Sequence, residues 1–293
     1  MIKKLSIIIA LFTGFILIII IGSGIILRLT FTPQKIKFFI IGQLSELTHR
    51  EIFIKSVHIG IFNPVIELEN IKVARKIRLS SGTFIEIDKV LLYPRIGPLL
   101  SGDIIIRSVV VIGPKLNLIN LSDTGIQFNV PKFSGKIHPF VGMTITKFIV
   151  DKGEIDYLSS LSKVGLIKIN EIKMVAKNIN LNSPFNTKLV SDIYLGDKKF
   201  SLVSSLYFNL IDTVIDISES EIISKSGISK IRGKITNFVE TPYIDIYITT
   251  TKSVLDDIKD MISLPFYMFV VPKTKEINLH LKGNFNNLTI KSL

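Results

Sequence analysis

Short segments in which apolar and polar residues alternate recur through most of this chain, and they limit its fold more than any other feature. In residues 101–119, SGDIIIRSVVVIGPKLNLI, a period of two places six apolar residues on one face: Ile104, Ile106, Val110, Ile112, Leu116 and Leu118. The other face carries charged and amide side chains: Asp103, Arg107, Lys115 and Asn117. A strand of this kind needs a surface that removes its apolar face from water.

The same alternation is clearest near the C-terminus. Two strands there place apolar residues on one face, namely Ile244, Ile246 and Ile248, and then Ile277, Leu279 and Leu281. Similar runs, rich in Ile, Val, Tyr and Phe and separated by turn residues, fill most of the chain from Ile52 to Ile290. The sequence therefore predicts a mainly β protein with a long antiparallel curved sheet, shaped either as a groove or as a sandwich.

Only two later segments are typical of helices, both short and amphipathic. In the first, Thr32 is the expected N-cap and Pro33 the first helical residue, and the apolar stripe follows helical spacing: Ile36, Phe39, Ile40, Leu44 and Leu47. This helix packs on the core or lies on a membrane surface. In the second, Ser253 begins a capping-box-like helix that ends before Pro265. Two such helices are too few to cover a sheet of this length.

An uncharged run from Leu5 to Leu27 precedes these elements. As a helix, about 23 residues span roughly 34 Å, slightly more than the hydrocarbon core of a bilayer. The run predicts a single transmembrane helix, with the short N-terminal tail in the cytoplasm and the rest of the chain exported; a cleaved signal peptide is the alternative. The predicted division is 1–30 for tail and anchor, 31–130 for a helix and β region, and 131–293 for a C-terminal β region with one short helix.

The chain is basic, with a formal net charge of +12, and it contains no cysteine. Disulfides and thiolate chemistry are therefore excluded. The lysines occur singly within strands, without an arginine-rich helix or an aromatic RNA-binding signature, so a solvated polar sheet face is favoured over nucleic-acid binding. A basic surface beside an anchor can also attract anionic lipid headgroups.

Motifs for catalysis and metal binding are missing from the sequence. The histidines are scattered without metal-ligand spacing: His49, His58, His138 and His280. No nucleotide-binding fingerprint or nucleophile elbow occurs, and a solvated surface accounts for the acidic clusters Glu219/Glu221 and Asp256/Asp257/Asp260. The sequence predicts no enzyme activity, no catalytic residue, no cofactor and no metal site.

Several weak motifs occur in a specific order along nearly the whole chain. The uncharged run leads into the Pro-led helix and a turn at 48–54, where His49 stands in place of an expected glycine. The pattern P-L-L-x-G-x-I-x-I-x-x-V-x-V-x-x-P-x-L-x-L is matched from Pro98 to Leu118, and Gly125 and Asn129 follow. Later come ITKFIVDKGEIDYLS, typical of a strand-turn-strand, and a closing LHLKGNFNNLTI. In this order the chain resembles the AsmA-like family of bacterial envelope proteins.

The resemblance implies a protein anchored in the bacterial inner membrane, with its C-terminal domain in the periplasm. It also implies a β-rich trough that carries or shields phospholipid and so supports lipid transport and outer-membrane assembly. Exposing an acyl chain of about 16 carbons to water costs on the order of 12 kcal/mol, and an apolar groove would remove most of that cost.

The predicted partners are the membrane, phospholipid and possible envelope proteins at the sheet edges. The candidate lining of the lipid groove is Ile104, Ile106, Val110, Ile112, Leu116, Leu118, Ile244, Ile246, Ile248, Ile277, Leu279 and Leu281. Each of these residues can equally belong to an ordinary core. The alternative function is a membrane-tethered β scaffold or assembly chaperone for envelope proteins, which would pair its edge strands with partner strands and carry no lipid.

Overall fold

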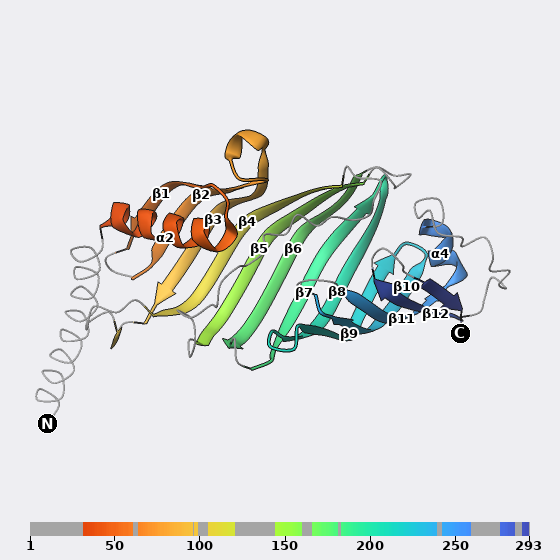
Figure 1. Ribbon diagram of the computed structural model, residues 1–293. Coiled ribbons are helices and arrows are strands. Elements are labelled where there is room, and N and C mark those ends of the chain that lie inside the picture. The colour runs from red at the N-terminus through yellow and green to blue at the C-terminus, as the bar shows by residue number, and fades with distance from the viewer. Residues whose placement is uncertain are drawn as a thin grey trace, which may run out of the picture.

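A computed structural model describes residues 32–60, 64–95, 97–98, 105–120, 144–159, 166–180, 183–238, 242–258, 276–284 and 289–292. These residues form one open sheet of 13 strands that follow one another in chain order (Figure 1). The strands are β1 (Ile52–Ile59), β2 (Ile66–Ala74), β3 (Thr83–Pro94), β4 (Ile106–Asn120), β5 (Thr144–Ser159), β6 (Leu166–Asn180), β7 (Phe185–Leu195), β8 (Lys198–Asn209), β9 (Val214–Ser224), β10 (Gly227–Thr236), β11 (Tyr243–Thr251), β12 (Glu276–Asn284) and β13 (Thr289–Ser292). The helices with described bounds are α2 (Pro33–Thr48), the 3-10 helix η1 (Leu79–Ser81) and α4 (Lys252–Ile258). The mainly β prediction is confirmed, with a single open sheet in place of a two-sheet sandwich.

One strand pair departs from the predicted antiparallel pattern. β4 and β5 run parallel, with Ser108 opposite Lys147 and Leu116 opposite Ile155. Parallel neighbours cannot be joined by a tight turn, because the chain has to return along the length of a strand. Residues 121–143, which follow β4 and precede β5 in the chain, lie outside the described residues. All other described strand pairs are antiparallel.

Residues with positive φ interrupt several strands and change which side chains share a face. They include Asn70 in β2 (φ 49°), Gly113 in β4 (φ 61°), Lys152 in β5 (φ 55°) and Glu171 in β6 (φ 52°). A bulge-like residue of this kind reverses the alternation of side chains beyond it. The predicted strand-turn-strand at 145–159 is therefore one long strand, β5, with an irregularity at Lys152 and Gly153.

A single apolar face runs through the sheet from one end to the other. Directly opposed residues share a face, so the strand registers can be followed from partner to partner. They connect one row of residues: Val57, Leu68, Val90, Val111, Val150, Met174, Leu189, Ser204, Ser220, Ile231, Ile248 and Leu279. We call the side of the sheet that carries this row the apolar face, and the opposite side the polar face.

The best-packed part of the core lies at the N-terminal end, where α2 packs against β1 (Figure 1). Thr32 caps α2 as predicted, with its Oγ1 accepting from the backbone N–H of Lys35 at 3.4 Å. Ile36 is buried against β1 to β3, and Ile40 and Ile41 pack beside it. The predicted apolar stripe is wrong at two positions, because Phe39 and Leu44 are exposed to solvent while Ile41, which the stripe omitted, packs on the core.

The boundaries of the two helices differ in how well they agree with the usual sequence signals for helix ends. α2 ends at His49, which adopts a left-handed conformation (φ 53°) in the position where glycine is most common. α4 begins at Lys252, so Ser253 lies inside the helix instead of capping it. Val254 of α4 is buried next to Gly227 of β10, and the remainder of the predicted helix, residues 259–265, lies outside the described residues.

Two serines interrupt the apolar row and hydrogen-bond to each other. Ser204 and Ser220 are both buried, and each hydroxyl has the other as its partner. Ser204→Ala leaves the Ser220 hydroxyl buried without a partner, so we expect a loss of about 1–3 kcal/mol in the free energy of unfolding. The double variant Ser204→Ala/Ser220→Ala is expected to lose less than the sum of the two single variants. Urea unfolding of the four proteins checks this, and additive losses would contradict it.

Candidate functional site

The packing of the apolar face changes along the sheet. Its residues in β1 and β2, such as Val57 and Leu68, are buried. In the central strands, Val111, Val150 and Met174 of the same row are only half-buried. Among the described elements, α2 packs on β1 at one end, and α4 contacts β10 and β11 at the other. The central apolar face lies between the contacts of these two helices and combines half-buried residues such as Val150 with buried ones such as Ala176, and it is the candidate functional site.

The register places the predicted lining residues of β4 on two different faces. Val111 opposes Val90, and Leu116 opposes Ile85, and both partners pack in the same core. Val110 and Ile112 oppose Leu91 and Lys89, so they lie on the polar face. The prediction that one face of this strand carries all six apolar residues is therefore wrong, because the alternation reverses at Gly113.

The other predicted residues of this strand have two different outcomes. Leu116 and Leu118 lie on the apolar face, opposite Ile155 and Tyr157 of β5. Ile106 lies on it too, opposite the buried Pro94 across a bulge. Ile104 lies outside the described residues.

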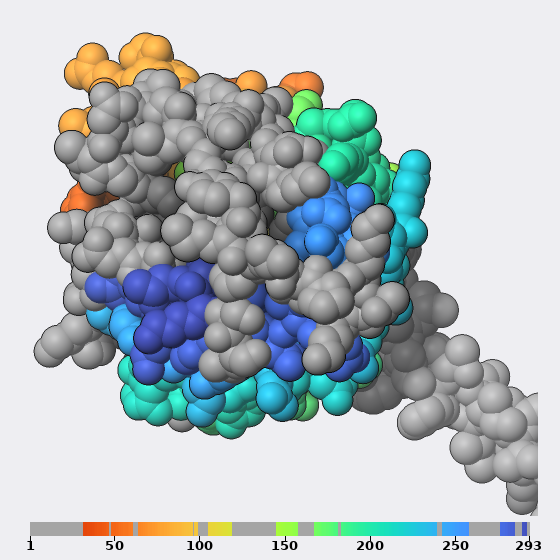
Figure 2. Space-filling view, turned by 90° about the vertical axis from the view of Figure 1, so that its right-hand side faces the viewer, coloured from red at the N-terminus to blue at the C-terminus, as the bar shows by residue number. Residues whose placement is uncertain are grey.

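The predicted residues near the C-terminus all share the apolar face. Ile246 opposes Leu281, Ile248 opposes Leu279, and Ile244 and Ile277 lie in the adjoining rows of the same strands. Ile244, Ile277 and Leu279 are buried, while the others are half-buried. Figure 2 views the molecule from this end of the sheet, where β12 and α4 face the viewer. Contact of these residues with lipid stays a prediction.

Sequence reasoning missed the part of the apolar face contributed by the middle strands. Its residues there are Val109, Val111, Phe148, Val150, Ile155, Ile169, Ile172, Met174 and Leu189. A glycine inside a strand pattern marks a bulge, and Gly113 and Gly153 carry that signal. Asn70 and Glu171 break the alternation at equivalent places without any such signal in the sequence.

Small hydroxyl side chains replace aliphatic ones on the apolar face from β7 to β11. The buried polar residues of the described chain are Thr187, Ser191, Ser204, Ser220, Ser229 and Thr250. Ser229 and Thr250 share a hydrogen bond with 2.5 Å between their oxygens. The hydroxyls of Thr187 and Ser191 have no hydrogen-bond partner within the described part of the chain. Among the described residues, the buried hydroxyls of this face therefore lie in its C-terminal half, from β7 to β11.

The polar face carries the charged residues and pairs many of them across strands. Lys115 approaches Asp156 at 3.3 Å, and Lys199 approaches Asp192 at 2.8 Å. The side chain of His280 is only 16% exposed, and its Nε2 lies 2.7 Å from Asp245 Oδ1. In the residues that the structure describes, no group of three His, Cys, Asp or Glu side chains could hold a metal ion.

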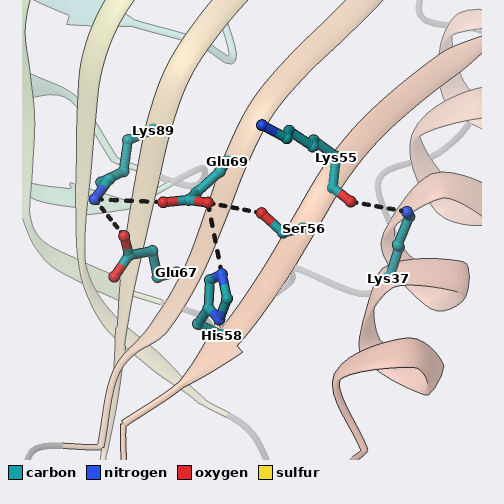
Figure 3. A network of polar contacts seen from close by, with 7 residues as sticks. All are labelled: Lys37, Lys55, Ser56, His58, Glu67, Glu69 and Lys89. Carbon is teal, nitrogen blue, oxygen red and sulfur yellow. Dashed lines mark hydrogen bonds and ion pairs between the residues drawn. The ribbon is translucent and has the colours of Figure 1, made fainter.

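A second polar cluster lies on the first strands, next to α2 (Figure 3). Glu69 accepts a hydrogen bond from Ser56 Oγ at 2.7 Å, and it also contacts His58 at 3.5 Å and Lys89 at 3.7 Å. The Ser56 hydrogen bond lowers the pKa of Glu69 most, and the charges of His58 and Lys89 lower it further. Lys89 also pairs with Glu67, so this cluster is a cross-strand charge network of ordinary type.

The lowered pKa of Glu69 makes the stability of the fold depend on pH. Because its pKa is lowered in the folded protein, Glu69 stabilises the fold at pH above its ordinary pKa, and this contribution is lost as the pH falls through the lowered value. We expect Ser56→Ala to raise the pKa of Glu69 toward the ordinary value. NMR titration of the Glu69 carboxyl carbon measures this, and an unchanged pKa in the variant would show that Ser56 does not set it.

Comparison with known proteins agrees with the motif order. The model of the AsmA family matches residues 1–191, which includes α2, β1 to β6 and most of β7. No curated protein matches the chain. The predicted anchor, residues 5–27, lies outside the described residues, and no helix within the described residues is long and apolar enough to cross a membrane.

Proposed function

The chain belongs to the AsmA family, and from this membership we propose that it holds phospholipid acyl chains on its apolar face. Family membership suggests a bacterial envelope protein with a lipid-related, non-enzymatic function. In the proposal, the uncharged run Leu5–Leu27 spans the inner membrane once, and the sheet lies in the periplasm. The protein would then shield lipid in transit and support assembly of the outer membrane.

One observation carries this proposal: a single row of residues crosses the sheet from β1 to β12, apolar except at Ser204 and Ser220, and it is half-buried from β4 to β7. With neighbouring strands about 4.8 Å apart, a row across 12 strands spans about 53 Å. That length is several times the ~15 Å depth of hydrocarbon in one leaflet of a bilayer. An acyl chain on this face could therefore stay shielded while it moves from strand to strand.

The chemistry of the site supports carriage without catalysis. From β1 to β7 the row consists of Val, Leu and Met side chains, which can remove methylene groups from water but cannot transfer protons or electrons. The serine and threonine hydroxyls of β7 to β11 lie farther along the same face, where the ester groups of a lipid would find polar neighbours.

The β scaffold remains a second candidate because one sheet edge is incompletely paired. β13 pairs with β12 only over Leu279–Lys282, so Ile277 and Asn278 have no strand partner on that side among the described residues. At the opposite edge, Lys37 Nζ already donates to the backbone carbonyl of Lys55 at 3.2 Å, which hinders strand addition to β1. A partner strand would therefore add at β12 and β13.

A photo-crosslinking experiment on the full chain in membranes separates the two functions. The matched positions are Ile222 and Ile223, which are adjacent and identical but lie on the apolar and the polar face of β9. A photoreactive amino acid at Ile222 is expected to yield a phospholipid adduct, and the same group at Ile223 is not. Protein adducts at a third position, Asn278, without lipid at Ile222 would favour the scaffold.

A further inference from the structure

The outward surface of α2 carries the most exposed aromatic side chains of the described chain. Phe38 is 71% exposed and Phe39 is 68% exposed, whereas Ile36 on the inner side of the helix is buried. Gly42, one turn later, has no heavy atom within 4 Å of where a side chain would begin, so nothing described covers this surface. Exposing two adjacent phenylalanine side chains to water costs free energy, and a second surface that covers them would remove this cost.

The exposed aromatic residues and the charges are unevenly distributed along α2. Both phenylalanines lie in the N-terminal half, together with the basic residues Lys35 and Lys37. The first acidic residue of the helix is Glu46, in the C-terminal half. Aromatic and basic residues side by side are typical of segments at the interface between hydrocarbon and lipid headgroups. The half of the helix suited to a bilayer surface is therefore the half that follows the uncharged run.

The chain between the uncharged run and α2 is too short to separate them. Leu27 and Pro33 are six residues apart, so at most about 20 Å of extended chain lies between them. If the run crosses the bilayer, as the proposed function requires, the start of α2 lies at or near the headgroup layer. Lys37 also lies over the ring of Phe53, at 5.9 Å, so this part of α2 is tied to β1.

We propose that Phe38 and Phe39 insert into the surface of the bilayer that holds the anchor, with Lys35 beside them at the headgroups. α2 then acts as a membrane-docking element that holds the β1 end of the sheet against the membrane. The occupant of this surface is the lipid bilayer, and the proposal rests on the transmembrane anchor of the proposed function. It adds a second membrane contact, which sets the orientation of the sheet.

Depth-dependent quenching on the full chain in liposomes tests this. The chain has no cysteine, so a single introduced cysteine is a unique labelling site. A polarity-sensitive dye at Phe39→Cys is compared with the same dye at Ile77→Cys, which is 75% exposed in the turn before η1. Lipids with a quencher just below the headgroups are expected to reduce the Phe39→Cys signal at least about two-fold and to leave Ile77→Cys unchanged.

A third label separates this proposal from the anchor itself. Phe15 lies in the middle of the uncharged run, and a dye at Phe15→Cys should respond to quenchers deep in the bilayer. Quenching at Phe15→Cys without quenching at Phe39→Cys would overturn the docking of α2 while the anchor stands. No quenching at Phe15→Cys would overturn the anchor. A dye at Phe39→Cys that is shifted to the blue but not quenched by lipid would identify a protein partner on this surface, which also overturns the proposal.

Discussion

Gly233→Ala is expected to reduce the free energy of unfolding by roughly 3 kcal/mol or more, since the backbone conformation and the space at this position both exclude a side chain. Gly233 has a φ of 144°, which other residues rarely adopt. An added Cβ would lie 2.2 Å from the carbonyl oxygen of Asp245 and 2.8 Å from Cα of Ile246. Both atoms belong to the backbone of β11, so relief requires β10 and β11 to separate.

Gly42→Ala is the matched control for this variant. Gly42 lies inside α2 with no neighbouring atom within 4 Å of an added Cβ. Alanine there is expected to stabilise the protein by about 0.5–1 kcal/mol, because it restricts the unfolded chain and favours the helix. Thermal and urea unfolding of both variants in the same detergent measure the difference. A Gly233→Ala protein as stable as the parent would show that β10 and β11 pair differently from the described register.

Val150→Asp is expected to remove more than nine-tenths of the phospholipid that copurifies with the full chain. Val150 lies in the centre of the apolar row, between Val111 and Met174, and it is half-buried. A carboxylate in contact with hydrocarbon costs about 2.5–3.5 kcal/mol, which corresponds to an approximately hundred-fold loss of affinity. Lipid extraction followed by mass spectrometry, normalised to protein, gives the amount bound.

Ile149→Asp is the control variant, because it introduces the same charge into the same strand but on the other face. Ile149 is the preceding residue of β5, also half-buried, and it opposes Val110 and Val175 on the polar face. This variant is expected to keep its lipid, and circular dichroism should show the same β content in both variants. Equal lipid loss from both, or lipid retained in Val150→Asp, would mean that the apolar face does not hold the acyl chains.

Elements that are set by residues close together in the chain, such as a helix cap or a strictly alternating strand, could be predicted from the sequence. The start of α2 follows from Thr32 and Pro33, because a capping hydroxyl and a fixed φ act within one helical turn. The strands near the C-terminus follow from strict alternation, since β11 and β12 contain no residue that reverses it before Gly283. The resemblance to the AsmA-like family, confirmed by the family match, depended on the order of such local patterns.

Features set by contacts far apart in the chain could not be predicted. The reversal of faces in β4 depends on a positive φ at Gly113, where an added Cβ would collide with the carboxylate of Asp88 in β3. The parallel pairing of β4 with β5 could not be predicted either. The alternation of apolar and polar residues does not say whether two neighbouring strands run parallel or antiparallel. Phe39 has a helical spacing that fits the core, but the path of β1 puts Ile41 there instead.

Because its strands pair in chain order, such a sheet can become longer or shorter across its strands by whole hairpins. Every described strand lies beside its neighbours in the chain, and all junctions but β4/β5 are antiparallel. Each hairpin therefore depends on the two strands next to it, much as each unit does in a repeat protein. Insertion or loss of a whole hairpin would lengthen or shorten the apolar row by about 10 Å and leave every other register unchanged. The length of the apolar face can thus be adjusted in steps of one hairpin, without redesign of the rest of the fold.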